Sequence, residues 1–499
     1  MSTYQGPGVR QKNIGLILLS LAFLPVDTFF TICALVSCYI SQPLATRRRN
    51  QARQKFDFSP KTILVTGVGM TKGLVIARSF YEAGHNVVGA DFEPSGALAC
   101  GRFSRSISEF LPLRPPKAGS GAGPYIESLL SIIKSEGVDL WVSCSGVASA
   151  LEDGEAKEII EARTSCKAIQ FDMRTTQTLH EKHSFMQHTK DIGLTVPDTH
   201  YIASREAVDD ALKKAPEGRK YIMKPVGMDD ANRGDMTLLP RPSTVETAAH
   251  LSKLRISEKS SWILQQYISG PEYCTHSLVV KGQVKAFVAC PSAELLMHYE
   301  ALPSDSKLHR AMLDFTLQYA RNGGESFTGH LSFDFMIDQN QMDGPHSVRE
   351  GMTPTLYPIE CNPRAHTAVV LFNETQGMPS AYLSVLDAPP ADWTGIDIVT
   401  PHSSDKYFWI GHDLVELLLL PLVSLLLMQP AASLSDLASG FSTFVNHVLY
   451  WRDGTFERWD PLPWWCLYHI YWPMRFLQSF NSGKGWSRIN VSTTKMFEC

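Results

Sequence analysis

Two strand-like segments that carry charged side chains constrain this chain more than any other feature. SFDFMID contains Asp334, and YPIECNPRAH contains Glu360, Asn362 and Arg364. Side chains alternate along a strand, so the last three share one face, and we expect Asp334 on a neighbouring strand. Burying these groups without a ligand is costly. The pattern therefore predicts a functional site on a sheet, and the alternative is an ion-paired structural cluster.

The oxygen atoms of this set suit a magnesium ion. Two carboxylates and an amide oxygen are hard ligands, and Mg²⁺ is usually held by a few protein oxygens together with substrate phosphates. Asp334, Glu360 and Asn362 are the candidate ligands, and Arg364 could reach a phosphate. The sequence thus indicates a site that handles metal and phosphate.

Upstream segments offer groups for a bound nucleotide. Lys224 ends the apolar strand KYIMKPV, where a buried ammonium needs an anionic partner, and Lys182 lies in HEKHSF. The loop after Lys224 contains Arg233, which could close over a triphosphate. LQQYISGPEY then offers the backbone groups of a strand, followed by Glu272 as an acceptor for ribose hydroxyls.

The order of strands and helices indicates two kinds of sheet. From Lys61, β-branched runs such as TILVTG alternate with amphipathic helices, which predicts a parallel α/β sheet. Beyond Gly193 the strands follow one another closely, which favours an α+β arrangement on antiparallel sheet, with the boundary near residue 180. The polar segment 338–354 is expected to be a mobile hairpin insertion. Helices are expected over residues 71–84, 204–214, 243–254 and 305–321.

A glycine-rich turn follows the first strand. Gly67, Gly69 and Gly73 lie between TILVTG and a helix, and Asp91 ends the next strand, which is the layout of a dinucleotide-binding turn. The spacing is Gly-x-Gly-x-x-x-Gly, and no Tyr-x-x-x-Lys follows to complete a short-chain dehydrogenase. We favour a Rossmann-like turn that needs glycine for packing alone, with an NAD(P)-dependent reductase as the alternative.

An apolar run over residues 14–40 precedes these units. It is long enough to cross a bilayer as a helix, and the basic residues that follow favour a cytosolic location for the rest of the chain. Three alternatives stay open: a spanning helix, an in-plane or re-entrant anchor bent at Pro25, and a buried core hairpin. The basic residues are Arg47, Arg48, Arg49, Arg53 and Lys55.

The C-terminal region combines a second apolar run with many aromatic residues. The run over residues 414–428 is short and interrupted by Pro421, and most of the tryptophans lie between residues 449 and 486. Trp and Tyr mixed with Pro, Arg and His suit a membrane interface. The alternative is that this tail packs on the folded core.

Composition excludes some classes of protein. The 46 Lys and Arg residues nearly balance the 50 Asp and Glu residues, for a net charge of -4, so bulk attraction to nucleic acid does not explain the function. The ten cysteines include no Cys-x-x-Cys pair and no zinc-like cluster with histidine. We therefore expect reduced thiols in a cytosolic protein.

Taken in order, the motifs resemble the ATP-grasp superfamily over roughly residues 61–375. The likeness is carried by the strand-end lysines, a hinge of the type Gln-Gln-Tyr-Ile-x-Gly-x-Glu-Tyr, and an Asp followed by Glu-x-Asn-x-Arg. It implies a Rossmann-like preceding domain followed by an ATP-grasp fold, with ATP and Mg²⁺ as cofactors. The residues implied are Lys182 and Lys224 for the phosphates, Gln266, Tyr267 and Ile268 for adenine, Glu272 for ribose, and Asp334, Glu360 and Asn362 for magnesium.

A finer likeness is to the mycosporine-glycine synthase type of ATP-grasp ligase. KTILVTGVGMTKG, IECNPRAHTA, WRDGTF and DPLPWW are among the segments that carry it. In that family an amino acid is joined to the cyclic enol-ketone 4-deoxygadusol at the expense of ATP. The resemblance implies an ADP-forming ligase that makes a C–N bond between an amino acid and a small carboxylate or enol-ketone acceptor. The expected catalytic residues are Arg364, His276, His366 and Arg233.

Other functions stay open beside this one. They are a dipeptide-forming carboxylate-amine ligase, the reductase named above, and an ATP-binding scaffold without activity. We expect a membrane-associated protein whose catalytic domains face the cytosol, with small-molecule substrates and no nucleic-acid partner. The expected units are residues 1–57 as a membrane anchor with a basic flank, 58–180 as the Rossmann-like domain, 181–385 as the ATP-grasp domain, and 386–499 as an apolar, Trp-rich region.

Overall fold

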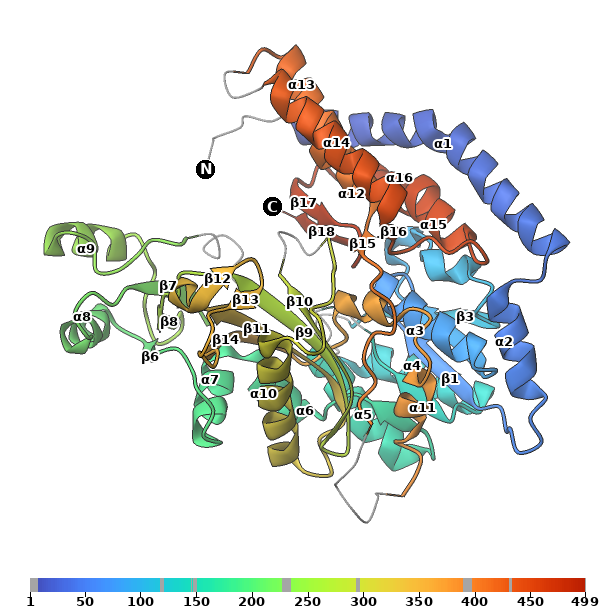
Figure 1. Cartoon of the computed structure of the whole chain (residues 1–499), viewed down its shortest axis with the longest axis horizontal. Helices are drawn as coiled ribbons and strands as arrows, with labels where there is room; N and C mark the ends of the chain where they lie inside the picture. The colour runs from blue at the N-terminus through green and yellow to red at the C-terminus, as the bar shows by residue number, and fades with distance from the viewer. Residues whose placement is uncertain are drawn as a thin grey trace.

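The structure is a computed structural model that describes residues 8–116, 121–144, 146, 150–226, 235–292, 297–388, 397–429 and 433–498. A parallel sheet forms the first folded unit, with strand order β3-β2-β1-β4-β5 (Figure 1). The expected alternation of strands and helices is confirmed. The strands are β1 (Thr62–Thr66), β2 (Asn86–Asp91), β3 (Glu109–Pro112), β4 (Leu140–Val142) and β5 (Lys167–Ile169), and the helices are α3 (Thr71–Glu82), α4 (Gly123–Glu136) and α5 (Ala150–Arg163).

Two antiparallel sheets follow, as the sequence predicts. After α6 (Met173–His180) and α7 (Lys182–Asp191), a three-stranded sheet β6-β8-β7 lies with α8 and α9 in an arm at the left of Figure 1. The four-stranded sheet β10-β9-β11-β14 packs against α10. The elements are β6 (Thr199–Ile202), α8 (Arg205–Lys214), β7 (Tyr221–Pro225), α9 (Thr244–Leu251), β8 (Trp262–Gln266), β9 (Glu272–Val280), β10 (Gln283–Pro291), α10 (Lys307–Gly323), β11 (Gly329–Ile337) and β14 (Leu356–Asn362).

The polar insertion forms the expected hairpin, and a helical region ends the chain. The hairpin strands are β12 (Met342–Gly344) and β13 (Ser347–Val348). One hydrophobic core joins the parallel sheet, strands β9 and β10 and the C-terminal region, so these parts pack as one body. The later elements are a 3-10 helix Thr367–Phe372, α11 (Met378–Leu383), β15 (Tyr407–Phe408), α12 (Ile410–Asp413), a π-helical turn Leu414–Leu419, α13 (Leu420–Leu426), α14 (Leu434–Tyr450), β16 (Arg452–Asp453), α15 (Leu462–Cys466), a π-helical turn Leu467–Tyr471, α16 (Trp472–Ser482), β17 (Trp486–Asn490) and β18 (Lys495–Glu498).

The N-terminal apolar run is one helix, α1 (Val9–Ile40), so the expected bend at Pro25 and the buried hairpin are both wrong. Polar contacts flank the proline on both sides. His469 hydrogen-bonds with Ser20 at 3.1 Å on one side and with Asp27 at 2.9 Å on the other. Within the described part of the chain, α1 alone is long and apolar enough to cross a membrane, and only 6% of its most apolar window is buried.

A polar stripe on α1 recurs every seven residues and faces the C-terminal region. Asn13 donates to Ser479 on α16, Ser20 and Asp27 meet His469, and the side chain of Trp465 donates to Thr28. A seven-residue repeat keeps side chains on one face of a helix. α1 is therefore apolar on its outer face and anchored by polar contacts on its inner face.

The basic block after α1 forms α2 (Leu44–Arg53), which docks on the parallel-sheet unit. Arg48 pairs with Glu82 at 2.9 Å, and Arg49 and Arg53 donate to backbone carbonyls at the end of α3. These guanidinium groups are thus bound to protein. Both ends of α1 are attached to the same folded body.

Several tryptophans of the C-terminal region pack on the core, as the alternative interpretation expects, and a role at a membrane interface stays a prediction. Trp464, Trp472 and Trp486 are buried. Trp459 stacks on Tyr81 of α3 with ring centroids 5.3 Å apart. The apolar run predicted around Pro421 is helical and partly exposed.

Candidate active site

Asp334 and Glu360 face each other on neighbouring strands, as the alternation predicts. They are partners in the register of β11 and β14, and a β-bulge follows Asp334. The side-chain amide of Asn362 donates to Asp334 Oδ2 at 3.1 Å. Arg364 in turn donates to Asn362 Oδ1 at 3.0 Å. The sheet thus gathers all four residues that the sequence placed together.

The second oxygen of Asp334 is the least satisfied polar atom of the site. Asp334 Oδ1 is buried and has no hydrogen-bond partner among the described residues. Burial, followed by the nearby carboxylates of Glu360 and Glu272, raises the pKa of Asp334 well above its usual range. A cation at this oxygen would relieve both the burial and the repulsion between like charges. Asp334 and Glu360 therefore fit the hard-oxygen site expected for Mg²⁺. The amide oxygen of Asn362 accepts from Arg364, so its predicted role as a third ligand stays a prediction.

Two lysines approach these carboxylates from outside the sheet. Lys182, the first residue of α7, lies 3.4 Å from Glu360 Oε2. Lys224 on β7 donates to Gln265 Oε1 at 2.8 Å. Burial, and then the charge of Lys182, lowers the pKa of Lys224 to about 8, against the opposing effect of Glu360 and Glu272. The predicted lysine pair is thus brought to the predicted carboxylates.

The hinge predicted to hold adenine is partly engaged by the protein itself. The amide of Gln266 donates to the Asp198 carbonyl at 2.7 Å, and the amide of Tyr267 donates to the Lys220 carbonyl at 2.8 Å. Ile268 is buried. These contacts join β8 to the neighbouring strands, so neither of the two amides is left to donate to a base.

Glu272 begins β9 on the side of the site where the hinge ends. Its Oε1 accepts from the Ser292 hydroxyl at 2.8 Å. It also opposes Met336 in the register of β9 and β11, two residues along from Asp334. Its predicted role at ribose stays a prediction. Arg233, the residue expected to close over phosphates, lies outside the described residues.

The two predicted histidines meet behind the carboxylates. His276 Nδ1 accepts from the His366 amide at 3.3 Å, and His366 Nδ1 accepts from the Ala368 amide at 3.2 Å. Burial lowers the pKa of His276 to about 3 and that of His366 well below its usual range. Both rings are therefore neutral at physiological pH. The Nδ1 contact of His276 supports the backbone of His366, and His276 Nε2 has no hydrogen-bond partner among the described residues. The catalytic roles predicted for the two histidines stay predictions.

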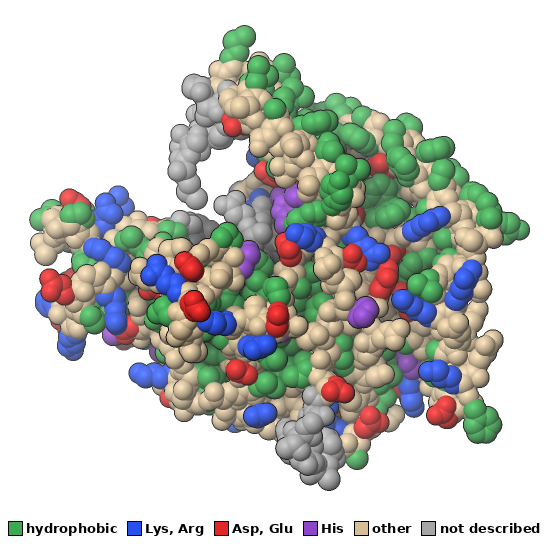
Figure 2. Space-filling model, viewed as in Figure 1, with side chains coloured by type: hydrophobic (Ala, Val, Ile, Leu, Met, Phe, Trp, Pro, Cys, Tyr) green, Lys and Arg blue, Asp and Glu red, His purple; other side chains and the backbone are tan. Residues whose placement is uncertain are grey.

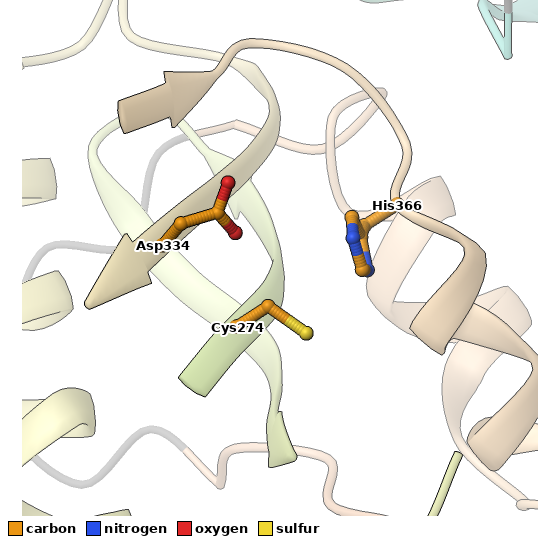
Figure 3. Close-up of side chains that lie close together, drawn as sticks. All are labelled: Cys274, Asp334 and His366. Atoms are coloured by element: carbon orange, nitrogen blue, oxygen red, sulfur yellow. The ribbon is translucent and has the colours of Figure 1, made fainter. Parts of the chain in front are cut away.

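Figure 3 shows that Cys274, Asp334 and His366 point toward one another, with their possible ligand atoms within 4.8 Å. Zn²⁺ would bind this trio through the thiolate of Cys274. Cys274 lies 3.4 Å from the Cys290 sulfur, and that contact, together with burial, raises the pKa of the Cys274 thiol. The metal-free thiol is therefore protonated, and the unpartnered Asp334 Oδ1 favours the carboxylates as the ligands of a hard cation.

The glycine-rich turn is filled by the protein's own groups. Asp91 accepts from the Gly69 amide at 2.6 Å and from the Phe92 amide at 2.7 Å. A Cβ at Gly73 would lie 2.4 Å from the Gly67 carbonyl oxygen. The acidic residue that a dinucleotide would need for its ribose is thus engaged in the turn, and the glycines are needed for packing. This geometry opposes the reductase alternative.

Two residues near the site escaped the sequence analysis. Gln265, the partner of Lys224, lies diagonally across from it on β8, and the period-two alternation could have identified it. Lys72, within the glycine-rich turn, donates to the Ala365 carbonyl at 3.0 Å. Burial, and then Arg364, lowers the pKa of Lys72 to about 7. Lys72 is the second residue of α3, the helix that follows β1, and its side chain is buried.

Comparison with known proteins gives likeness in structure only. No family model and no curated protein matches the sequence. Similar solved chains include N5-carboxyaminoimidazole synthetase from Staphylococcus aureus complexed with ADP, at 14% identity and TM-score 0.46, covering 67% of this chain and 80% of that one. L-amino acid ligase from Bacillus licheniformis has 13% identity and TM-score 0.42, with 66% and 73% covered.

A third similar chain is the biotin carboxylase domain of 2-oxoglutarate carboxylase from Hydrogenobacter thermophilus, in complex with MgADP and bicarbonate. It has 12% identity and TM-score 0.48, with 66% of this chain and 71% of that chain covered. The function proposed for this chain rests on its own residues.

Proposed function

We propose that this chain is an ATP- and Mg²⁺-dependent ligase of the ATP-grasp type, which forms a C–N bond between an amino acid and a small carboxylate or enol-ketone acceptor. The main support for the proposal is that three carboxylates and two lysines lie close together in one site. Glu272, Asp334 and Glu360 come from three adjacent strands, and Lys182 and Lys224 come from α7 and β7. Opposed carboxylates and ammonium groups suit a metal-bound polyphosphate.

Each group has a proposed task in phosphoryl transfer. Lys182 and Lys224 hold the phosphates of ATP, and Arg364, fixed by Asn362, offsets charge on the transferred group. Asp334 and Glu360 would hold magnesium, which supplies charge neutralisation at the phosphates when bound. The parallel-sheet unit is, in this proposal, the Rossmann-like domain that precedes the ATP-grasp fold.

The proposed reaction has two steps. An oxygen of the acceptor attacks the terminal phosphorus of ATP, a P–O bond forms, and ADP leaves. The amine of the amino acid then attacks the activated carbon, a C–N bond forms, and phosphate leaves with the oxygen while the amine releases a proton. The chain's contribution is to hold the reacting groups together and to offset charge.

The finer proposal is an acceptor of the mycosporine type, which the sequence likeness supports. Buried Lys72 donates to the Ala365 carbonyl, beside Arg364, and burial followed by the charge of Arg364 lowers the pKa of its amine to about 7. An anionic acceptor such as an enolate or a carboxylate would favour the charged form of Lys72 and pair with Arg364. A peptide-forming ligase would use a carboxylate there.

One experiment tests the reaction class and the substrates together. Full-length protein is incubated with Mg-ATP, a panel of amino acids, and either 4-deoxygadusol or simple carboxylates as acceptors, while phosphate release and product mass are followed. We expect phosphate release only when an amine and an acceptor are both present. Mg-ATP binding without turnover on any pair would favour the inactive scaffold, and binding of NADPH in place of ATP would reject the proposal.

We further propose that α1 lies in the plane of a membrane and does not span it. A helix of 32 residues is about 48 Å long, so a single span would place its ends on opposite sides of the bilayer. Here Asn13 near one end bonds to α16, and α2 beyond the other end docks on α3. The outward-facing side chains of the helix, including Leu18, Leu21 and Phe29, are exposed.

Membrane extraction and labelling separate the two arrangements. A protein held in the plane sediments with membranes and has both ends of α1 on one side. In a background that carries Cys33→Ala and Cys38→Ala, cysteines introduced at exposed Gln11 and Gln54 should then react with an impermeant maleimide from the same side. Labelling from opposite sides would establish a span and reject the in-plane proposal. A protein that is monodisperse in plain buffer would reject both.

A further inference from the structure

A large apolar cavity lies beneath α1, apart from the candidate active site. Its volume is about 820 Å³, within the range of small-molecule sites. It is lined by residues of α1, α14, the two π-helical turns and the rest of the C-terminal region. None of the residues predicted to hold ATP or magnesium lines it. Its walls include Leu19, Val415, Phe444, Trp464 and Phe476.

The cavity opens onto an exposed apolar face made by α1, α13 and α14. Figure 2 shows apolar side chains gathered along the upper edge of the molecule, where these helices lie. Phe23, Val26 and Phe30 of α1 and Val448 of α14 are exposed and also line the cavity. Apolar surface therefore continues from the outer face of the protein into its interior. Large exposed apolar patches mark sites of interaction with other apolar partners.

A cationic residue lies at the rim of this apolar cavity. Arg458 lines the cavity, is exposed, and donates to the Ser37 hydroxyl at the end of α1 at 3.3 Å. Among the residues that the structure describes, no carboxylate forms an ion pair with Arg458. Asp27, Asp453 and Glu457 also line the cavity, but their carboxylates are already hydrogen-bonded to other parts of the protein. A guanidinium beside an apolar cavity suits an amphiphile with an anionic head, because it can bind a phosphate through two parallel hydrogen bonds.

We propose that the cavity binds one acyl chain of a membrane phospholipid, with the lipid phosphate at Arg458. A phospholipid matches the three features together: an apolar chain for the interior, a lipid surface for the exposed helices, and an anionic head for the rim. The mouth between α1 and α14 gives the chain a direct path from the bilayer. This inference extends the in-plane association of α1 and does not depend on the ligase reaction.

Native mass spectrometry of the full-length protein, extracted in detergent, tests the proposal by counting bound lipid. Val415→Trp fills the cavity, and Leu422→Trp makes the same kind of change on the exposed face of α13, outside the cavity. We expect about one phospholipid on the wild type and the control, and at least about a tenfold lower amount on Val415→Trp. Equal lipid on both variants, or free fatty acid or detergent alone on the wild type, would overturn the proposal.

Two further measurements keep the test independent of any folding defect. Phospholipids brominated on the acyl chain should quench Trp464 and Trp472 in the cavity wall, so the double substitution Trp464→Phe and Trp472→Phe should remove part of the wild-type quenching. Unchanged fractional quenching would show that the chain stays outside. Arg458→Gln should reduce retained phospholipid several-fold while leaving thermal unfolding unchanged, and undiminished retention would refute the phosphate contact.

Discussion

ATP binding is expected to be coupled to proton uptake by Lys224. Burial and Lys182 lower the pKa of Lys224 from 10.5 to about 8 in the free protein, so at pH 8 about half of the molecules carry a neutral amine. ATP phosphates beside the amine favour the ammonium and raise its pKa again. Binding at pH 8 should therefore take up about 0.5 proton per ATP, and binding at pH 7 only about 0.1.

The size and sign of the effect follow from the same pKa change. The difference between a pKa of 10.5 and one of about 8 means that the folded protein disfavours the charged form of Lys224 by roughly 3 kcal/mol. Because ATP binds the charged form, ATP affinity should fall by up to about tenfold per pH unit above pH 8. For stability the sign is opposite. The unfolded chain binds the proton more tightly than the folded protein, so the free protein should gain stability as pH rises from about 8 to 10.5.

Isothermal titration of ATP at pH 8 in two buffers with different ionisation enthalpies measures the proton uptake. Lys224→Met should weaken ATP binding and abolish the uptake. Lys213→Met, an exposed lysine on α8, should change neither quantity and serves as the control. Zero uptake in the wild type, or equal uptake in Lys224→Met, would refute the assignment of Lys224 to the phosphates.

Three other changes test separate parts of the structure. Glu360→Gln should keep the thermal unfolding profile yet lower product formation by about a hundredfold or more. Exposed Glu350→Gln is its control, and activity of Glu360→Gln above about a tenth of wild type would contradict the magnesium assignment. Gly73→Ala forces a Cβ to 2.4 Å from the Gly67 carbonyl oxygen and should destabilise the fold by about 1–3 kcal/mol without weakening ATP binding, whereas Gly123→Ala meets nothing within 4 Å and should have little effect. Asp27→Ala leaves His469 without its carboxylate partner, so it should lower the free energy of unfolding by about 1–3 kcal/mol and raise hydrogen exchange along α1. Exposed Cys33→Ala is the control and should change neither quantity.

The alternation of side chains was enough to predict the centre of the candidate site. It placed Glu360, Asn362 and Arg364 on one face and Asp334 opposite them, and the register of β11 with β14 has this pairing. The same rule extends to Gln265, which lies diagonally across β8 from Lys224. Such pairings are local to a sheet, so a pattern of period two carries them.

Contacts between distant segments could not be derived in this way. Asp27 and His469 are 442 residues apart, and buried Arg78 pairs with Asp460 across 382 residues. The partner of a polar side chain at such a separation depends on how whole units pack, which no local period encodes. The polar stripe of α1 was nevertheless visible as the seven-residue spacing of Asn13, Ser20 and Asp27. That spacing would have argued for a helix with one protein-facing side and against a hairpin.

The apolar helices and the candidate active site are joined through one buried carboxylate. Asp413 at the end of α12 is hydrogen-bonded by His447 of α14 at 2.6 Å and by His298 at 2.9 Å. His298 adjoins Tyr299, whose ring meets His366 edge-on with centroids 5.9 Å apart. A buried carboxylate held by two imidazoles is costly to release, because either loss leaves a desolvated oxygen without a donor. The position of α14 is therefore linked through Asp413 to His298, whose neighbour Tyr299 packs against the ring of His366.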